Sequence, residues 1–237
     1  MYKRQIQDHL QEVCELLFPT APQRYGFRPS ALWRYEQEEL QRMLRILVEW
    51  ECEQNREVAR FTPYLLEAGF GIRGYSVKPL DILVEDTQFR LRGLIDRVDR
   101  DADGNLRVLD YKSGSMKFSK SDLRKGIALQ TALYALAAEK FWVGTGGHVA
   151  ESHYWHIPIR EASGSLSFQG KVRDDELAEA AIQHAAWSVE RVRSGIFPSA
   201  PEKPIAGAFS CRSYCDYGPI CRVTRQSIFK ARQGGLV

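Results

Sequence analysis

The chain is organised around residues 91–112, which read LRGLIDRVDRDADGNLRVLDYK. Apolar and polar residues alternate on both sides of the turn-forming run at 101–105, and this pattern predicts a β-hairpin. Successive side chains of a strand point to opposite faces, so Asp110 and Lys112 project from one face of the second strand. Asp96 ends the first strand in this interpretation and is expected to reach the same place.

Two carboxylates beside a lysine suit the metal-dependent hydrolysis of phosphodiesters. Carboxylate oxygens bind hard divalent cations such as Mg²⁺, and the cation polarises a phosphoryl oxygen and generates a nucleophile from bound water. Lys112 can orient that water or stabilise the charge that develops on the phosphate. The alternative is a solvated hairpin whose charged residues merely pair. Ile95 and Leu109 beside the charges indicate a half-buried strand, where unpaired charges are costly, and favour a functional site.

The motif Gly93-Leu-Ile-Asp-Arg-Val-Asp99, followed by Leu109-Asp-Tyr-Lys-Ser-Gly114, resembles the PD-(D/E)XK nuclease superfamily. Within it the pair is similar to the RecB-like nuclease domain of AddB-type helicase–nucleases and of CRISPR-associated single-strand exonucleases. The resemblance implies an α/β restriction-endonuclease-like core, with a central mixed β-sheet flanked by helices. It also implies a metal-dependent deoxyribonuclease of DNA repair or recombination, and it favours an exonuclease.

The resemblance further implies roles for individual residues around a Mg²⁺ or Mn²⁺ ion. Asp96 and Asp110 become its ligands, with the carbonyl of Tyr111 and with His9 of the first expected helix. Lys112 assists the attacking water. The alternative for His9 is a surface histidine or a satisfied core histidine, because a lone histidine on a helix is usually one of these.

Three further residues are candidates for shaping the site. Gln130 and Tyr134 are four apart in an expected helix and therefore share a face. A Gln-x-x-x-Tyr helix borders the site in the resembled family, although the pair alone is uninformative. Glu67 resembles the glutamate of a family strand and is expected to orient the site; the alternative is a strand-end carboxylate that pairs with an arginine.

Composition is ordinary for a globular protein, with 44% hydrophobic and 27% charged residues among 237. The net charge of +3 permits nucleic-acid binding without arguing for it. No apolar run is long enough for a membrane span, and the N-terminus does not resemble a signal peptide, so we expect a cytoplasmic protein without a membrane partner. The resemblance implies DNA as partner, as single strands or duplex ends, and a helicase domain or subunit.

Hydrophobic periodicity predicts the remaining elements. Apolar residues at helical spacing and helix-breaking residues indicate helices at about 6–18, 29–60, 127–141 and 174–193. Strands are expected at 64–77, from 89 into the central hairpin, and at 149–159. His153 and His156 would face opposite sides of the last of these strands, which excludes a joint metal site.

We expect a nuclease core over residues 1–197, and a Pro-rich linker with a cysteine-containing tail over 198–237. Closely spaced thiols in the tail, in a chain with no export signal, favour a metal centre over disulfides, and they are Cys211, Cys215 and Cys221. The resemblance implies a [4Fe–4S] cluster. Its fourth ligand would be Cys14, or less readily Cys52, or a cysteine preceding the chain, which would then be a fragment. Unligated cysteines and a zinc site completed by a histidine stay open.

Two other functions compete with catalysis. The chain could be a catalytically silent nuclease-fold module that binds DNA or a helicase partner. It could also be a structural, cluster-bearing subunit whose tail docks a partner. Intact Asp96, Asp110 and Lys112 argue against lost chemistry.

Overall fold

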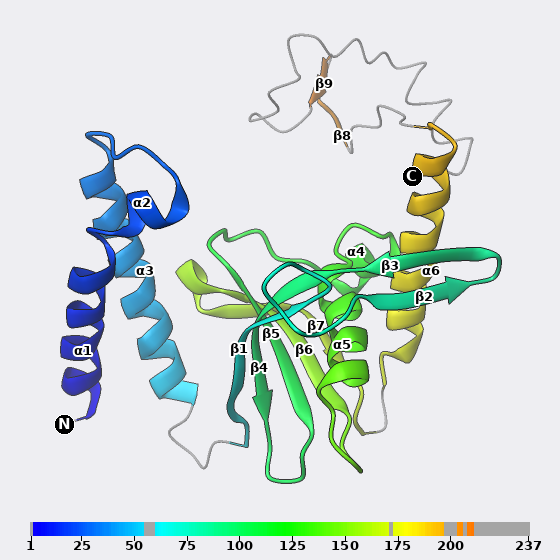
Figure 1. Ribbon diagram of the computed structural model, residues 1–237, viewed down its shortest axis with the longest axis horizontal. Helices are drawn as coiled ribbons and strands as arrows, with labels where there is room; N and C mark the ends of the chain where they lie inside the picture. Colours follow the sequence, from blue (N-terminus) through cyan, green and yellow to red (C-terminus); the bar gives the residue numbers. More distant parts are fainter. Residues whose placement is uncertain (1, 55–59, 171–172, 197–202, 206–207, 211–237) are drawn as a thin grey trace.

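A computed structural model describes residues 2–54, 60–170, 173–196, 203–205 and 208–210 (Figure 1). Its centre is a five-stranded sheet of order β1-β4-β5-β6-β7, made of Thr62–Phe70, Gly93–Arg100, Leu106–Lys112, Val149–His156 and Glu161–Ser167. Neighbouring strands are antiparallel except β5 and β6, which are parallel. The expected mixed sheet flanked by helices is therefore confirmed.

The central hairpin consists of β4 and β5. Its turn is closed by Asp101, whose Oδ1 accepts hydrogen bonds from the amides of Asp103 at 3.0 Å and Asn105 at 2.8 Å. Pairing runs from Arg100↔Leu106 to Arg97↔Leu109 and stops there. Asp96 therefore lies within β4, and the prediction that it ends the strand is wrong. Asp96 directly precedes Arg97, the last residue of β4 that pairs with β5, so it lies where this pairing stops.

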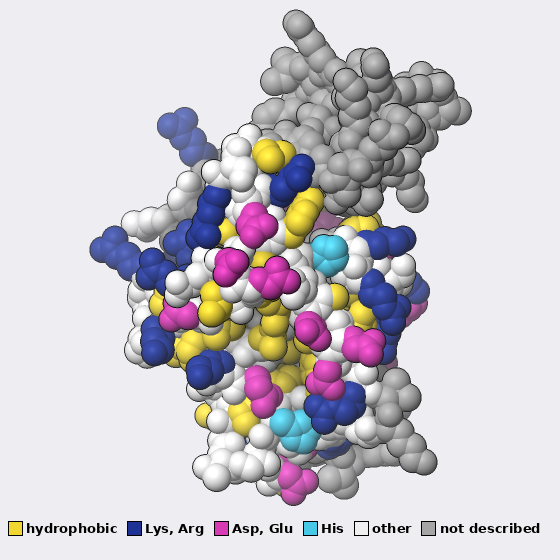
Figure 2. Space-filling view, turned by 90° about the vertical axis from the view of Figure 1, so that its right-hand side faces the viewer, with side chains coloured by type: hydrophobic (Ala, Val, Ile, Leu, Met, Phe, Trp, Pro, Cys, Tyr) yellow, Lys and Arg dark blue, Asp and Glu magenta, His cyan; other side chains and the backbone are white. Residues whose placement is uncertain are grey.

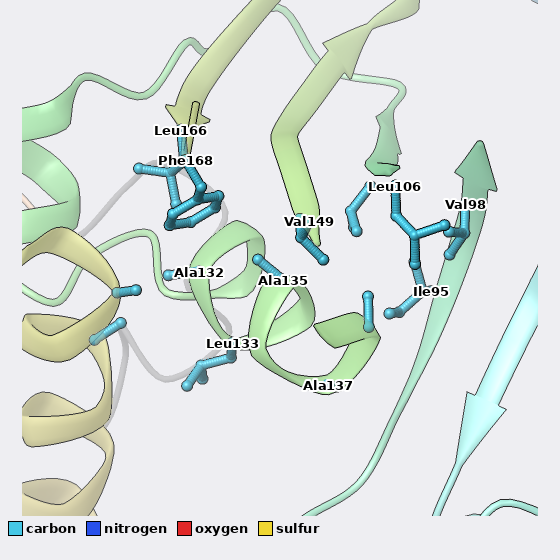
Figure 3. Close-up of a cluster of buried hydrophobic side chains, with 14 of the residues drawn as sticks. Ile95, Val98, Leu106, Ala132, Leu133, Ala135, Ala137, Val149, Leu166 and Phe168 are labelled. Atoms are coloured by element: carbon cyan, nitrogen blue, oxygen red, sulfur yellow. The ribbon is translucent and has the colours of Figure 1, made fainter. Parts of the chain in front are cut away.

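Helix α5 (Gln130–Phe141) covers one face of the sheet, and α6 (Asp175–Arg193) packs on α5. Small side chains on both helices allow a close approach, which buries α5 on nearly all sides. Figure 3 shows this core between α5 and the strands, with Ala132, Ala135, Ala137, Ile95, Val98, Leu106, Val149, Leu166 and Phe168. The expected helices at 127–141 and 174–193 are confirmed, with slightly later starts.

The opposite face of the sheet is covered by α3 (Trp33–Gln54), and α1 (Tyr2–Leu17) packs against α3 (Figure 1). Trp50 of α3 stacks on Trp155 of β6 with ring centroids 4.5 Å apart. The short α2 (Ala21–Tyr25) joins the two long helices. The helix expected at 29–60 is confirmed in type but is shorter. None of the described helices combines the length and apolar character that crossing a membrane requires.

A second, two-stranded sheet was not expected from the sequence. It consists of β2 (Leu80–Val84) and β3 (Thr87–Leu91), and it packs on α6 through Ile82 and Phe89. Two expected strands are corrected accordingly: the strand at 64–77 ends at Phe70, before Gly71 with φ +67°, and residues 89–91 belong to this hairpin. Alternation continues from β3 into β4, so periodicity could not separate them.

Several shorter elements complete the described part. They are α4 (Lys120–Arg124), a 3₁₀ turn (Ile157–Ile159) that ends the strand expected at 149–159, and the pair β8 (Lys203–Ile205) and β9 (Ala208–Ser210). Strand β7 was also not expected. The cysteines of the tail lie outside the described residues, and so does most of the expected linker.

A buried ion network joins β4 and β5 to α3. Asp99 is fully buried and accepts from Arg97 Nε at 2.5 Å and from Arg107 Nη2 at 2.6 Å. Arg97 Nη1 also donates to Glu51 Oε1 of α3 at 2.6 Å. Burial opposes the charge of Arg97, but its bond to Asp99 and the neighbouring acidic groups raise its pKa above the ordinary value. Arg97 therefore stays charged, and its bonds to Asp99 and Glu51 tie the sheet to α3.

Replacing Asp99 should show how much the fold depends on this network. Asp99→Ala would leave two guanidinium groups inside the protein without their shared carboxylate, so we expect a loss of about 3–5 kcal/mol in the free energy of unfolding. Urea denaturation followed by circular dichroism measures it. Glu39→Ala removes an exposed pair with Arg42 and should leave the midpoint unchanged. Equal effects of both variants would contradict a structural role for the network.

Candidate active site

Asp110 and Lys112 leave the same face of β5, on the side of α5. The Lys112 Nζ lies 2.5 Å from Asp110 Oδ2 and 5.0 Å from the centre of the Tyr154 ring. Asp110 is 3% exposed, and the Lys112 ammonium is the partner of its buried Oδ2. Burial raises the pKa of the Asp110 carboxyl, Lys112 opposes this, and the charge of Asp96 adds to it.

Asp96 faces Asp110 across the end of the hairpin. Its Oδ2 accepts a hydrogen bond from the Tyr111 amide at 2.7 Å. The two faces of the strand exchange sides at this point, because Ile95 and Val98 contribute to the same core although they are three positions apart, an odd spacing. Asp96 lies at this point, and its carboxylate is directed at the backbone of β5.

Glu67 lies opposite this point of β4, on β1. Its neighbours Leu66 and Ala68 pair with Arg97 and Ile95, which places Glu67 across from Asp96. It is exposed and has φ +49°, a conformation that is unfavourable for a side chain other than glycine. The structure thus brings Glu67 to the neighbourhood of Asp96, and its orienting role stays a prediction.

The helix α5 contributes the next residues through a chain of hydrogen bonds. Lys112 Nζ donates to Gln130 Oε1 at 2.9 Å, and Gln130 Nε2 donates to the Tyr134 hydroxyl at 3.2 Å. Gly93 permits this arrangement, because a Cβ there would lie 2.9 Å from Tyr134 Cε1. Gln130 therefore contacts Lys112 directly, Tyr134 is linked to it through Gln130, and their role in shaping the site stays a prediction.

The site fits a small divalent cation bound through few protein ligands. Asp110 presents a buried carboxylate paired with Lys112, and Asp96 supplies a second carboxylate close to it. Within the described ranges, no group of three or more His, Cys, Asp or Glu side chains could hold a metal ion. Mg²⁺ commonly binds proteins through one or two carboxylates and keeps several waters, so this pair is sufficient.

His9 is not brought to these carboxylates. Its side chain is 77% exposed, and its Nδ1 lies 3.4 Å from Glu12 Oε2 of the same helix. The physical reason is the layer order: α1 packs outside α3, and α3 covers the face of the sheet opposite to Asp110 and Lys112. A role for His9 as a ligand would require a different position of α1.

Cys14 is buried between the N-terminal helices, and burial raises the pKa of its thiol. A raised pKa disfavours the thiolate that metal or cluster ligation requires, and it is typical of an inert structural cysteine. Cys52 is a half-buried free thiol of α3. The structure does not describe Cys211, Cys215 and Cys221, so the predicted cluster is left without a described ligand set.

Sequence reasoning missed two sets of residues around the site. The motif includes Arg97 and Asp99, but no role was predicted for them. They lie on the face of the sheet that α3 covers, and counting alternate residues onward from Asp96 could have indicated that face. Tyr154 lies under Lys112, and His156 is buried on the same side of β6. Nothing in the local sequence distinguishes Tyr154 and His156, since their pairing with β5 is a property of the sheet.

A groove of about 450 Å³ lies away from this site, between α5, α6 and the start of β6. Its lining includes the apolar Leu136 and Ile182, the acidic Glu139 and Glu179, and the basic Arg173. Figure 2 shows the side of the molecule that carries α6, where apolar side chains lie between charged ones. None of the candidate site residues lines the groove.

The comparison with known families agrees with the geometry. Residues 2–222 match the sequence model of the PD-(D/E)XK nuclease superfamily. The chain belongs to this superfamily. The membership accounts for the mixed sheet and for the motif pair on β4 and β5, and members of the superfamily generally use Mg²⁺ or Mn²⁺.

Curated relatives carry the name of an ATP-dependent helicase/deoxyribonuclease, of which each is one subunit. The protein from Oceanobacillus iheyensis is 36% identical over 124 residues, which cover 48% of this chain and 10% of the relative. The one from Lysinibacillus sphaericus is 28% identical over 187 residues, covering 75% of this chain and 16% of the relative. The chain therefore matches only a small part of the length of these relatives.

Because the pKa of Asp110 is raised, its negative charge is expected to lower the free energy of unfolding. A carboxyl with a folded pKa above its unfolded value destabilises the protein at neutral pH, and this cost disappears as the pH falls through the folded pKa. In chelator, Asp110→Asn should therefore unfold at the same or a higher temperature than wild type at pH 7. Differential scanning calorimetry tests this, and a clear decrease in melting temperature would contradict it.

Asp122 provides the matched control for this prediction. Bonds from the amide and hydroxyl of Ser119 lower the pKa of Asp122, so its charge stabilises the protein above the unfolded pKa. Asp122→Asn should accordingly lower the melting temperature at pH 7, and the difference from wild type should vanish as the pH falls through the lowered pKa.

Proposed function

We propose that this chain is a nuclease domain that hydrolyses DNA phosphodiester bonds with Mg²⁺ or Mn²⁺. The observation that carries the proposal is the arrangement of Lys112 between the buried Asp110 and Gln130, with Asp96 across the end of the hairpin. Superfamily membership and the deoxyribonuclease relatives support the same chemistry.

In this mechanism Asp96 and Asp110 hold the cation, with the Tyr111 carbonyl as a further oxygen ligand. The bound cation supplies Lewis-acid activation of the phosphate and of the attacking water. Lys112 orients the water and stabilises the negative charge that develops on the phosphate. Its ammonium group is held by Gln130, which is itself fixed by Tyr134, so the lysine needs little reorganisation during the reaction.

The substrate and setting are proposed from the relatives. Their name joins a helicase to a deoxyribonuclease, so we propose that the domain acts on single strands or duplex ends presented by a helicase domain or subunit. Exonucleolytic cleavage follows from such a presentation, since a helicase delivers an end and the adjacent strand.

Alanine variants at the three central positions test the proposal. Asp96→Ala and Asp110→Ala should abolish cleavage of labelled single-stranded DNA in Mg²⁺ or Mn²⁺, because each removes a cation ligand. Lys112→Ala should lose about 10²–10³-fold in single-turnover rate while its affinity for DNA changes little, because the lysine acts on the transition state.

The controls are Lys117→Ala, which removes a lysine paired with Glu161 beside the site, and His9→Ala. Both should cleave at nearly the wild-type rate. Wild-type activity of either aspartate variant would refute the assignment, and DNA binding without cleavage in the wild type would favour a silent module. A loss in His9→Ala equal to that in Asp110→Ala would show that α1 reaches the site.

We also propose that Cys211, Cys215 and Cys221 hold an iron–sulfur cluster, on the spacing of the three thiols. The full chain purified without oxygen should be brown and contain about four irons, in line with a [4Fe–4S] centre. Cys215→Ser should lose the colour and the iron, whereas Cys14→Ser should retain both if the fourth ligand is not Cys14. Colourless, iron-free protein would overturn this proposal and leave the nuclease assignment intact.

A further inference from the structure

His156 is a buried histidine beside the catalytic lysine. It is 1% exposed, and it is the Cα partner of Lys112 at the last pair of the parallel β5–β6 ladder. Its Nδ1 lies 2.8 Å from the carbonyl oxygen of Gly114, and its Nε2 lies 2.7 Å from Ser163 Oγ. It thus connects the loop that follows Lys112 to strand β7.

The partners of His156 assign its tautomer. The Gly114 carbonyl can only accept, so Nδ1 carries the proton and donates it to that oxygen. In the neutral ring Nε2 accepts from the Ser163 hydroxyl, and Ser163 Oγ accepts from the Phe118 amide at 3.1 Å. The ring therefore uses both of its nitrogens and links Gly114 to Ser163.

The loop after Lys112 is attached to β7 at its far end by other contacts. Gly164 donates to the Phe118 carbonyl at 2.8 Å, Lys117 pairs with Glu161 at 2.7 Å, and the Phe118 ring packs on Tyr154. At the near end, Gly114 is exposed and has open space around it where a Cβ would be. Among the described contacts, the hydrogen bond from His156 to the Gly114 carbonyl restrains that end of the loop.

We propose that His156 is a positioning residue, which fixes the Gly114 carbonyl and thereby the backbone from which Lys112 reaches the phosphate. This proposal rests on the nuclease function proposed above. The lysine side chain has four rotatable bonds, so a small shift of its backbone displaces the ammonium group from the reacting atoms. Displacements of about 1 Å can cost about 10²-fold in rate.

Two amide variants separate the hydrogen bond from simple packing. The side-chain nitrogen of His156→Asn takes the place of Nδ1 and can still donate to Gly114. His156→Gln places its amide near Nε2, facing Ser163, and leaves the Gly114 carbonyl without a donor. We expect His156→Asn to stay within about tenfold of the wild-type single-turnover rate and His156→Gln to lose about 10²-fold, with unchanged DNA affinity. A packing role predicts the reverse order, since asparagine leaves the larger cavity.

A double-mutant cycle tests whether His156 acts through Lys112. His156→Gln combined with Lys112→Ala should be no slower than Lys112→Ala alone, because the positioned group is already absent. Additive losses would overturn the proposal. Ile82→Ala, in the cluster between the β2–β3 hairpin and α6, is the stability control and should lower the melting temperature without changing the rate.

Backbone dynamics give a readout that does not depend on cleavage. The NMR order parameters of the Gly114 and Ser115 amides should stay above about 0.8 in wild type and His156→Asn, and fall below about 0.6 in His156→Gln. Equal order parameters in the two variants would overturn the proposal that His156 restrains Gly114. If the order parameters differ as expected but the wild type cleaves no DNA, the proposed function and the positioning of Lys112 for catalysis fail, while the restraint of Gly114 by His156 stands.

Discussion

The arrangement of β4 and β5 depends on the ion pairs of the fully buried carboxylate of Asp99. Two guanidinium groups, those of Arg97 and Arg107, share it inside the protein, and Arg97 extends the network to Glu51 of α3. Loss of one partner would leave an unpaired buried charge and destabilise the protein strongly. A shift in the register of β4 on β5 would separate these partners in the same way. Since Asp96 and Asp110 are placed by that register, a structural ion network on one face positions the candidate site on the other.

Buried charged side chains have different surroundings on the two faces of the hairpin. On the α3 side, the described buried charges of Arg97, Asp99 and Arg107 are paired with one another and with Glu51. On the α5 side, Asp110 is buried with the Lys112 ammonium as its partner, and burial raises the pKa of its carboxyl. A buried carboxylate of raised pKa is costly to keep charged, and such groups are typical of functional sites.

Positioning of Lys112 involves elements that are distant in the sequence. Its ammonium group contacts Asp110 of the same strand, Gln130 of α5 and the ring of Tyr154 of β6. The loop that follows it is bound by His156 at the Gly114 carbonyl, and His156 in turn bonds to Ser163 of β7. The parallel pairing of β5 with β6, with α5 as the crossover between them, brings these groups to one place. A flexible side chain thereby becomes confined from several directions.

The sequence by itself determined the hairpin, its turn and the shared face of Asp110 and Lys112, because these follow from the period-2 alternation of a strand and from turn chemistry. It also determined that Gln130 and Tyr134 share a helix face, since their spacing is local. Only the tertiary structure decided which helix covers which face of the sheet. That choice places Gln130 at Lys112 and keeps His9 away, on the far side of α3. It also decided that β3 and β4 belong to different sheets, and that Tyr154 and His156 lie beside the lysine. These outcomes depend on pairing and packing between distant segments, for which a local pattern contains no information.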